Sequence, residues 1–195
     1  MFGSSERSLS DNDVIQEILS WNSSAFEIIY ERYSKQLYNY ILTLLNFNTD
    51  EAGLVLSDVF IKVYDYLQKK DIDNLKSLLF KIAHNTAVDW IRAHQHQDRH
   101  LPRELETYVD PKDLIRKGAL NTAYKKQLMA DCLSKLDEKY RSVIYLLYYE
   151  GKSYDDIAVI QQSNKNSIGT IAFQWKKKLE EIIKKSGLDP NIFLL

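Results

Sequence analysis

Cysteine, proline and glycine are all scarce in this chain of 195 residues, which contains one Cys, three Pro and six Gly. The single cysteine, Cys132, cannot form an internal disulfide, so the chain is not a disulfide-stapled secreted domain and a reducing compartment is favoured. Cys132 lies on an apolar helical face and is predicted to be a core residue. Because Pro and Gly interrupt helices, long periodic stretches without them predict an all-α fold.

The chain also lacks a long hydrophobic run. Its N-terminal residues contain no apolar stretch resembling a signal peptide, and no segment approaches the length of a transmembrane helix. We therefore expect a soluble, cytoplasmic protein without membrane insertion.

Motifs of catalysis are missing as well. The sequence has no Gly-rich phosphate loop, no Cys/His metal spacing and no nucleophile motif. His94, His96 and His100 could touch a metal, but they lie in a polar segment without a fourth ligand, so contact with phosphate or solvent is the better interpretation. We expect no enzymatic activity, no metal and no cofactor.

Net charge is small but unevenly distributed. Residues 1–80 carry seven Lys/Arg and twelve Asp/Glu (7 − 12 = −5), whereas residues 81–195 carry nineteen and fifteen (19 − 15 = +4). An acidic front half and a basic back half favour two kinds of partner, a basic protein surface and a polyanion.

Hydrophobic periodicity predicts two small helical domains joined by a linker. The expected boundaries are an N-terminal segment (1–20, partly mobile), a first domain (21–96), a linker (97–120), a second domain (121–186) and a C-terminal tail (187–195). Within the first domain, helices are expected over residues 25–46, 51–67 and 74–92, with Thr49 or Asp50 capping the second of these.

The predicted helix 74–92 has an unusual polar face. Its apolar residues share one side, and the other side carries amides, cations and one carboxylate. Such a face offers donors and acceptors to base edges and positive charge to phosphates. The residues of this face are Lys81, His84, Asn85, Val88, Asp89 and Arg92.

A second candidate face lies near the C-terminus. Ser153 and Asp156 form a capping-box variant at the start of one helix, and after a short turn Asn164 caps another, which is the helix-turn-helix pattern. On the outer side of the last helix, Gln can read adenine, Thr and Phe can meet a thymine methyl, and Lys can anchor phosphates. The residues of this side are Lys165, Ser167, Gly169, Thr170, Phe173, Gln174 and Lys177.

Two stretches together resemble the extracytoplasmic-function (ECF) sigma factors of the sigma-70 family. AGLVLSDVFIKVYDYL followed by LLFKIAHNTAVDWIR is similar to region 2, and LDEKYRSVIYLLYYEGKSYDDIA is similar to region 4. The resemblance covers residues 26–92 and 129–179. It implies a bacterial transcription initiation factor that binds core RNA polymerase, recognises the −10 and −35 promoter elements and melts DNA.

The resemblance also implies roles for individual residues. Helix 51–67 would bind the clamp helices of the largest polymerase subunit, region 4 would face the beta flap, and the loop 68–73 with helix 81–92 would melt and read the −10 element. Holding an unstacked base there offsets the few kcal/mol that unstacking costs. The expected polymerase contacts are Val55, Asp58, Val59 and Lys62. The expected −10 contacts are Lys69, Lys70, Lys81, His84, Asn85, Val88, Asp89 and Arg92. The expected −35 contacts are Lys165, Ser167, Gly169, Thr170, Phe173, Gln174 and Lys177.

Several positions depart from the family pattern. Gly53 and Leu54 replace acidic residues, and Gly169 and Gln174 stand where basic residues are usual. The last two predict weak −35 binding, so a recruiting factor is expected to help the protein to its promoter, and an anti-sigma factor is a further candidate partner. Two alternatives stay open: a helix-turn-helix regulator without polymerase binding, and a polymerase or anti-sigma interaction module without initiation activity.

Overall fold

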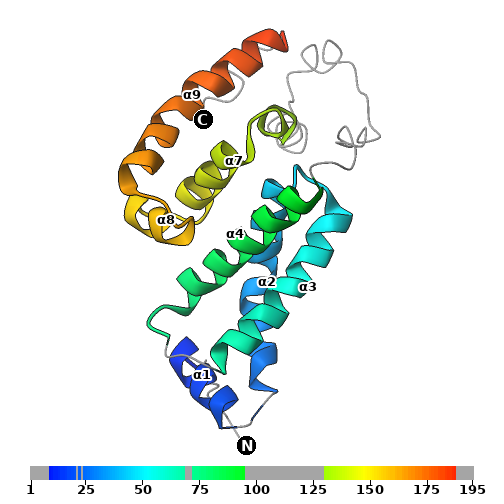
Figure 1. Cartoon of the computed structure of the whole chain (residues 1–195), viewed down its shortest axis with the longest axis vertical. Helices are drawn as coiled ribbons and strands as arrows, with labels where there is room; N and C mark the ends of the chain where they lie inside the picture. Colours follow the sequence, from blue (N-terminus) through cyan, green and yellow to red (C-terminus); the bar gives the residue numbers. More distant parts are fainter. Residues whose placement is uncertain (1–8, 21, 23, 69–71, 95–129, 188–195) are drawn as a thin grey trace, which may run out of the picture.

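The computed structural model describes residues 9–68 except 21 and 23, residues 72–94 and residues 130–187, and this part of the chain is helical without strands (Figure 1). The predicted all-α class is confirmed. The first four helices are α1 (Asp11–Leu19), α2 (Ala25–Leu44), α3 (Thr49–Leu67) and α4 (Leu75–His94). The second group is α7 (Glu138–Ile144), the π-helical turn η1 (Tyr145–Tyr149), α8 (Tyr154–Ile160) and α9 (Lys165–Lys185). The predicted linker 97–120 and most of the tail lie outside the described residues.

Helices α1 to α4 form one bundle around a core of aliphatic and aromatic residues. Val14, Ile15 and Ile18 bring α1 into this core, together with Tyr40 and Phe80 from α2 and α4. The start of α3 differs from the prediction, because the Asn48 side chain accepts the amides of Asp50 and Glu51. Thr49 and Asp50 are therefore inside the helix, and Asn48 is its N-cap.

The second domain has its own small core and a register shift. Cys132 is 1% exposed and packs with Leu136, Tyr140 and Leu179, so its predicted core position is confirmed. The π-helical turn adds a residue to the turn that follows α7, which changes the side chains that point inward. Leu146 is fully buried as a result, and Leu147, which periodicity places inside, is only partly buried.

A polar junction holds the two domains together. Arg141 in α7 is 7% exposed; its Nε donates to the Thr43 carbonyl oxygen at 2.7 Å and its Nη2 donates to the Leu44 carbonyl oxygen at 2.9 Å. The last carbonyl groups of a helix have no amide partner within that helix, and the C-terminal end of the helix dipole favours a cation. The guanidinium group therefore satisfies the end of α2 while anchoring α7 to it.

A second set of contacts extends the junction to α4 and to the turn after α8. The Tyr40 hydroxyl lies 2.7 Å from Ser142 Oγ and 2.9 Å from His84 Nδ1, and Gln161 Nε2 donates to Ser142 Oγ at 2.7 Å. The hydrophobic core also continues across the junction, where Leu146 and Ile160 belong to the same cluster as Leu37 and Phe80.

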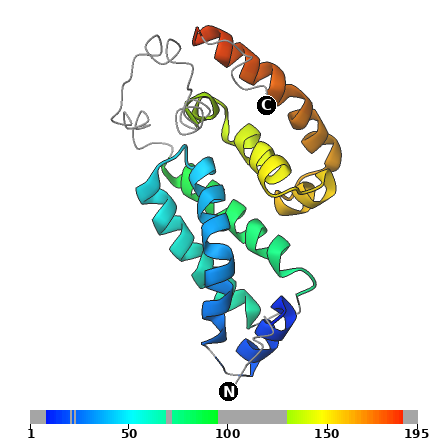
Figure 2. The ribbon, with the colours of Figure 1, turned by 180° about the vertical axis from the view of Figure 1, so that it is seen from behind.

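This junction decides which helix faces are open. Helix α8 lies against α4, whereas α9 runs along the outer edge of the second domain, away from the first bundle (Figures 1 and 2). Within the described residues, no helix combines the length and the hydropathy required to cross a bilayer.

Candidate nucleic-acid interface

The helix-turn-helix of the second domain is built by strong local signals. Ser153 Oγ accepts the Asp156 amide at 3.2 Å while the Asp156 carboxylate accepts from the Ser153 amide and hydroxyl, so the predicted capping box is confirmed. The same hydroxyl lowers the pKa of Asp156. At the start of α9, Asn164 Oδ1 accepts the Ser167 amide at 2.8 Å, as predicted. Between them Gln162 has a φ of 50°, which turns the chain sharply.

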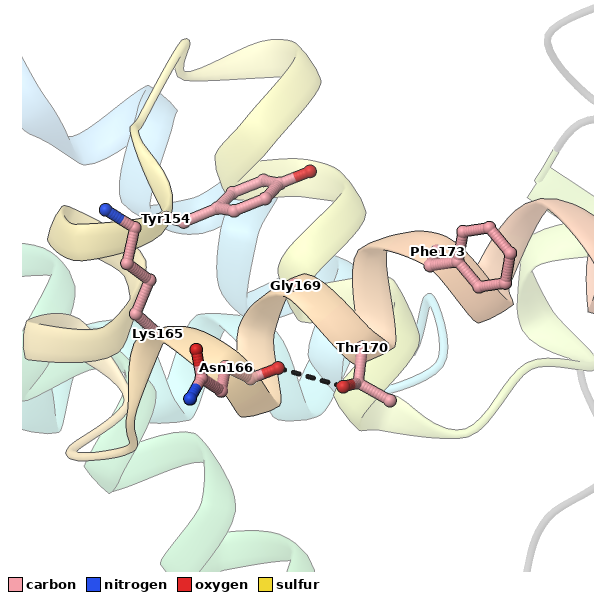
Figure 3. Close-up of a pocket in the computed structure, with 6 residues that line it drawn as sticks. All are labelled: Tyr154, Lys165, Asn166, Gly169, Thr170 and Phe173. Atoms are coloured by element: carbon pink, nitrogen blue, oxygen red, sulfur yellow. Dashed lines mark hydrogen bonds between the residues drawn. The ribbon is translucent and has the colours of Figure 1, made fainter.

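The outer side of α9 carries a shallow pocket open to solvent (Figure 3). The ring of Tyr154, at the start of α8, lies over Gly169, and Phe173 extends from the next turn of α9 with 84% of its surface exposed. Four of the lining residues, Lys165, Gly169, Thr170 and Phe173, are among those predicted for this face, and Tyr154 and Asn166 are additional.

Three polar groups on this side of α9 have partners within the second domain. The Lys165 ammonium pairs with Asp155 at 2.7 Å, and the Thr170 hydroxyl donates to the Asn166 carbonyl oxygen at 2.9 Å. The Gln174 carboxamide oxygen accepts from the Tyr140 hydroxyl at 3.1 Å. Lys177 is exposed, as is the neighbouring Lys176. Ser167 is only partly exposed.

The polar face of α4 is bordered by the other domain. Its residues and the turn after α8 line one shared groove, formed by His84, Asn85, Val88, Asp89, Arg92, Gln161 and Gln162. Asp89 and Arg92 are exposed, with side-chain exposures of 69% and 70%, and their charged groups lie 3.6 Å apart. Asn85, Val88 and Lys81 are partly exposed. The groove therefore keeps a charged, accessible rim and a half-covered floor.

His84 occupies the covered end of this groove. Burial, with a smaller contribution from the charge of Arg92, lowers the pKa of His84 to about 4. The imidazole is therefore neutral at pH 7 and does not supply positive charge to a phosphate. Its hydrogen bond to Tyr40 makes it a junction residue, which revises the simple contact role predicted from its place on the polar face.

The predicted polymerase surface on α3 divides into buried and exposed residues. Val55 and Val59 are 0% exposed and belong to the core, so their prediction as direct contacts is wrong; helical periodicity brings them to the apolar stripe. Asp58 is exposed. On the same side, Leu54 is 59% exposed and Ile61 is 63% exposed, and neither was predicted.

Other predicted residues have mixed outcomes. Lys62 is exposed and its ammonium donates to Thr86 Oγ1 at 3.1 Å. Lys69, Lys70, His96 and His100 lie outside the described residues. His94 Nδ1 lies 2.8 Å from the Trp90 carbonyl oxygen, and its ring stacks on that indole. In the part of the chain that the structure describes, no group of three His, Cys, Asp or Glu side chains is placed to hold a metal ion.

Some of the missed residues carried a readable signal and others did not. Leu54 and Ile61 are spaced seven residues apart, so periodicity could have shown that both share a side with Asp58. Asn166 follows Lys165 in the first turn of α9, so the sequence could also have predicted that it lies near this face. Gln161 and Gln162 reach α4 only through the junction, for which the local sequence has no pattern.

Comparisons with known proteins agree with this geometry. Residues 126–179 match the family model of Sigma-70, region 4. The chain is 21% identical over 165 residues to the ECF RNA polymerase sigma factor SigM of Bacillus subtilis, an alignment that covers 83% of this chain and 96% of SigM. It is 22% identical over 157 residues to the ECF sigma factor SigK of Mycobacterium tuberculosis, covering 80% and 83%.

The resemblance to ECF sigma factors is confirmed.

Solved structures support the same fold. The sigma factor RpoE of Bartonella quintana, solved with the anti-sigma factor NepR, superposes with a TM-score of 0.63 at 21% identity, covering 82% of this chain and 96% of RpoE. CnrH, solved with the cytosolic domain of CnrY, superposes with a TM-score of 0.62 at 20% identity, covering 90% and 97%. The predicted fold of two helical domains, the second with a helix-turn-helix, agrees with these superpositions.

Proposed function

We propose that this protein is a cytoplasmic transcription initiation factor of the ECF sigma type that binds core RNA polymerase and directs it to promoters. The observation that carries the proposal is the pair of polar helix faces, on α4 and on α9, which lie on two separate helical domains. One of these domains matches sigma-70 region 4. Two such faces suit a protein that contacts promoter DNA at two places.

The outer surface of α3 supports polymerase binding. Leu54 and Ile61 expose more than half of their surface beside Asp58, so the surface combines apolar area with negative charge. Interfaces of this kind gain affinity from a buried apolar centre and gain association rate and specificity from charge complementarity. A basic, partly apolar helical partner, such as the clamp helices of the largest polymerase subunit, fits this surface.

The polar face of α4 supports contact with the −10 element. Asn85 offers a carboxamide to a base edge, and the exposed pair Asp89 and Arg92 offers an acceptor and a donor at the rim of the groove. A protein that holds an unstacked base in such a site offsets the cost of opening the duplex without hydrolysing a nucleotide. In this role the protein has no catalytic step of its own.

Helix α9 supports contact with the −35 element in the major groove. Its first-turn cation, Lys165, is paired with Asp155, and no basic residue stands at Gly169 or Gln174. We expect weak −35 binding, assistance from the polymerase beta flap, and a recruiting factor at the promoter. The two solved relatives are complexes with an anti-sigma factor and with CnrY, so an anti-sigma factor is a proposed partner here as well.

Reconstitution with core RNA polymerase tests the proposal. The purified chain should co-elute with core polymerase and direct transcription from a genomic promoter library, with defined start sites found by sequencing transcript ends. Asp58→Arg should lower polymerase affinity at least tenfold, because it places a cation against a basic partner. Glu180→Arg, which makes the same charge change on exposed α9, should leave that affinity unchanged.

The possible failures are informative. Duplex binding without polymerase binding would indicate a helix-turn-helix regulator instead. Polymerase binding without any defined transcript start would indicate an interaction module. Equal polymerase affinity of Asp58→Arg and the unchanged protein would contradict the assignment of α3 as the docking surface.

A further inference from the structure

The bonding pattern on the outer side of α9 separates its polar groups from its apolar ones. Three kinds of base contact are chemically available to such a face: a carboxamide on adenine, a cation on guanine, or apolar contact with thymine. The structure distinguishes among them through the partners that each side chain already has.

Two of the polar side chains, Gln174 and Lys165, have partners within the domain. Bidentate reading of adenine needs both the oxygen and the nitrogen of a carboxamide, and the Gln174 oxygen already accepts from the Tyr140 hydroxyl at 3.1 Å, which turns it toward its own domain. Reading guanine needs a free Arg or Lys facing the base edge, and Lys165 is held by Asp155 at 2.7 Å.

The apolar route is open. Phe173 exposes 84% of its surface, an unusual state for a large aromatic side chain on a surface helix. The Thr170 hydroxyl is turned back onto the Asn166 carbonyl oxygen, so its γ-methyl group is the part left for an incoming ligand (Figure 3).

Gly169 leaves space for a methyl group between these residues. A carbon atom placed where a Cβ of Gly169 would stand lies 3.9 Å from two ring carbons of Tyr154, which is an ordinary van der Waals contact. The open pocket lined by Tyr154, Gly169, Thr170 and Phe173 therefore offers apolar contacts and room to a small apolar group that protrudes from a base edge. In the major groove the C5 methyl of thymine is the only such group on an unmodified base.

We infer that α9 selects upstream promoter DNA by the 5-methyl groups of thymine, with Phe173 as the principal contact and Tyr154 and Thr170 beside it. This rests on the proposed binding of the −35 element by α9 and names the base feature that is read there. The expected promoter has thymine at the positions that face Phe173 and shows little dependence on guanine.

A methyl-deletion experiment tests the inference. The full chain bound to core polymerase is first used to select tight-binding duplexes from a library with a randomised upstream block. The selected duplex is then remade with deoxyuridine in place of thymidine in that block only, which removes the methyl groups and keeps base pairing. Burial of one methyl group corresponds to about fourfold in affinity, so the deoxyuridine duplex should bind at least fourfold more weakly.

Two variants assign the effect. Phe173→Ala should bind the thymidine duplex about as weakly as the unchanged protein binds the deoxyuridine duplex, and should no longer distinguish the two. Since Phe173 is exposed, this variant should fold normally, as checked by circular dichroism. Lys177→Ala is the matched control on the same helix: it should weaken both duplexes equally, through phosphate contact, and keep the difference between them.

The possible results of this experiment test three separate claims: methyl recognition, the role of Phe173 and −35 binding by α9. If the unchanged protein binds both duplexes equally, methyl recognition is wrong while −35 binding stands. If Phe173→Ala keeps the full difference, the contact lies elsewhere and the assignment to Phe173 is wrong. If no upstream sequence is enriched at all, the proposed −35 function of α9 fails.

Discussion

The polar faces of α4 and α9 look alike in sequence and differ in the folded chain. Both combine an amide and cations on one side of a long amphipathic helix. The pocket on α9 is lined only by residues of α8 and α9, whereas the face of α4 forms one side of a groove whose other side is Gln161 and Gln162. A polar pattern therefore predicts which side of a helix stays outside the core of its own domain. It does not predict whether another domain packs against that side.

The two faces also differ in what their side chains are bonded to. On α9 the cation Lys165 and the amide Gln174 are held by residues of the same domain. On α4 the imidazole of His84 is held by Tyr40, which in turn contacts Ser142 of the other domain. Separating the domains should therefore change the α4 face strongly and the α9 face little.

The largest expected effect comes from Arg141→Ala, which removes the charged anchor of the junction between the two domains. The Thr43 and Leu44 carbonyl oxygens lose a charged donor, which costs about 3 kcal/mol in the free energy of docking. Small-angle scattering should show a larger radius of gyration, and denaturant unfolding followed by tryptophan fluorescence should show an earlier first transition. Lys139→Ala, which removes an exposed cation from the same helix, should change neither; equal behaviour of the two variants would contradict the junction.

Acid should affect the α4 face next most strongly. The pKa of His84 is about 4 in the fold, against an ordinary value of 6.5, so below pH 6.5 the unfolded chain binds a proton that the folded chain does not. Stability that is present above pH 6.5 is then lost as the pH falls towards 4, by about 3 kcal/mol. Unfolding titrations at several pH values should show this loss. His84→Gln should show a smaller loss, while His94→Gln, which keeps His84, should retain the full loss.

Asn85→Ala should impair DNA opening, the proposed role of the α4 face, without affecting duplex binding by the α9 face. Removing the carboxamide from α4 should reduce open-complex formation about tenfold, since one or two hydrogen bonds to an unstacked base are lost. Permanganate reactivity of thymines in the melted region measures the opening, and gel retardation measures duplex binding. Binding of the upstream duplex should stay unchanged, because that contact belongs to α9. Asn12→Ala, at an exposed position on α1, is the control; an equal fall in opening for both variants would remove Asn85 from the proposed site.

The smallest expected effect is a gain of binding on α9. Asp155→Ala releases Lys165 and removes a carboxylate from the side that faces DNA, so affinity for the upstream duplex should rise about threefold. The gain should shrink as salt is raised, which fluorescence anisotropy at several salt concentrations can measure. Glu180→Ala removes a distant exposed carboxylate and should give a smaller change; a larger one would contradict a specific role for the Lys165–Asp155 pair.

Local signals predicted most of the second domain correctly. The capping box of Ser153 and Asp156 and the Asn164 cap depend on residues three apart, so their geometry follows from adjacent sequence. The cap of α3 was placed one or two residues late, because Asn48, Thr49 and Asp50 are all good caps and propensity does not choose among them. Regular helical periodicity places Leu147 in the core, but the structure buries Leu146 there. The π-helical turn causes this shift, and a 3.6-residue period does not include such a turn.

The functional residues also divide into those that local sequence could predict and those that depend on distant contacts. Periodicity could distinguish Asp58 from Val55 and Val59, since helix geometry turns the latter two into the core. It could not show that His84 would be neutral and bonded to Tyr40, because these residues are 44 positions apart. Nor could it show which groups on α9 would already be occupied by Tyr140 and Asp155.

The amino-acid order was enough to determine the helices, their caps and the resemblance to ECF sigma factors, because each depends on residues within a few positions of one another. Only the tertiary structure decided that α4 lies beside α8 and that α9 faces outward. That choice depends on Arg141, Tyr40 and Ser142, which bond to partners about a hundred residues away and acquire those partners only when the two domains pack around a shared core.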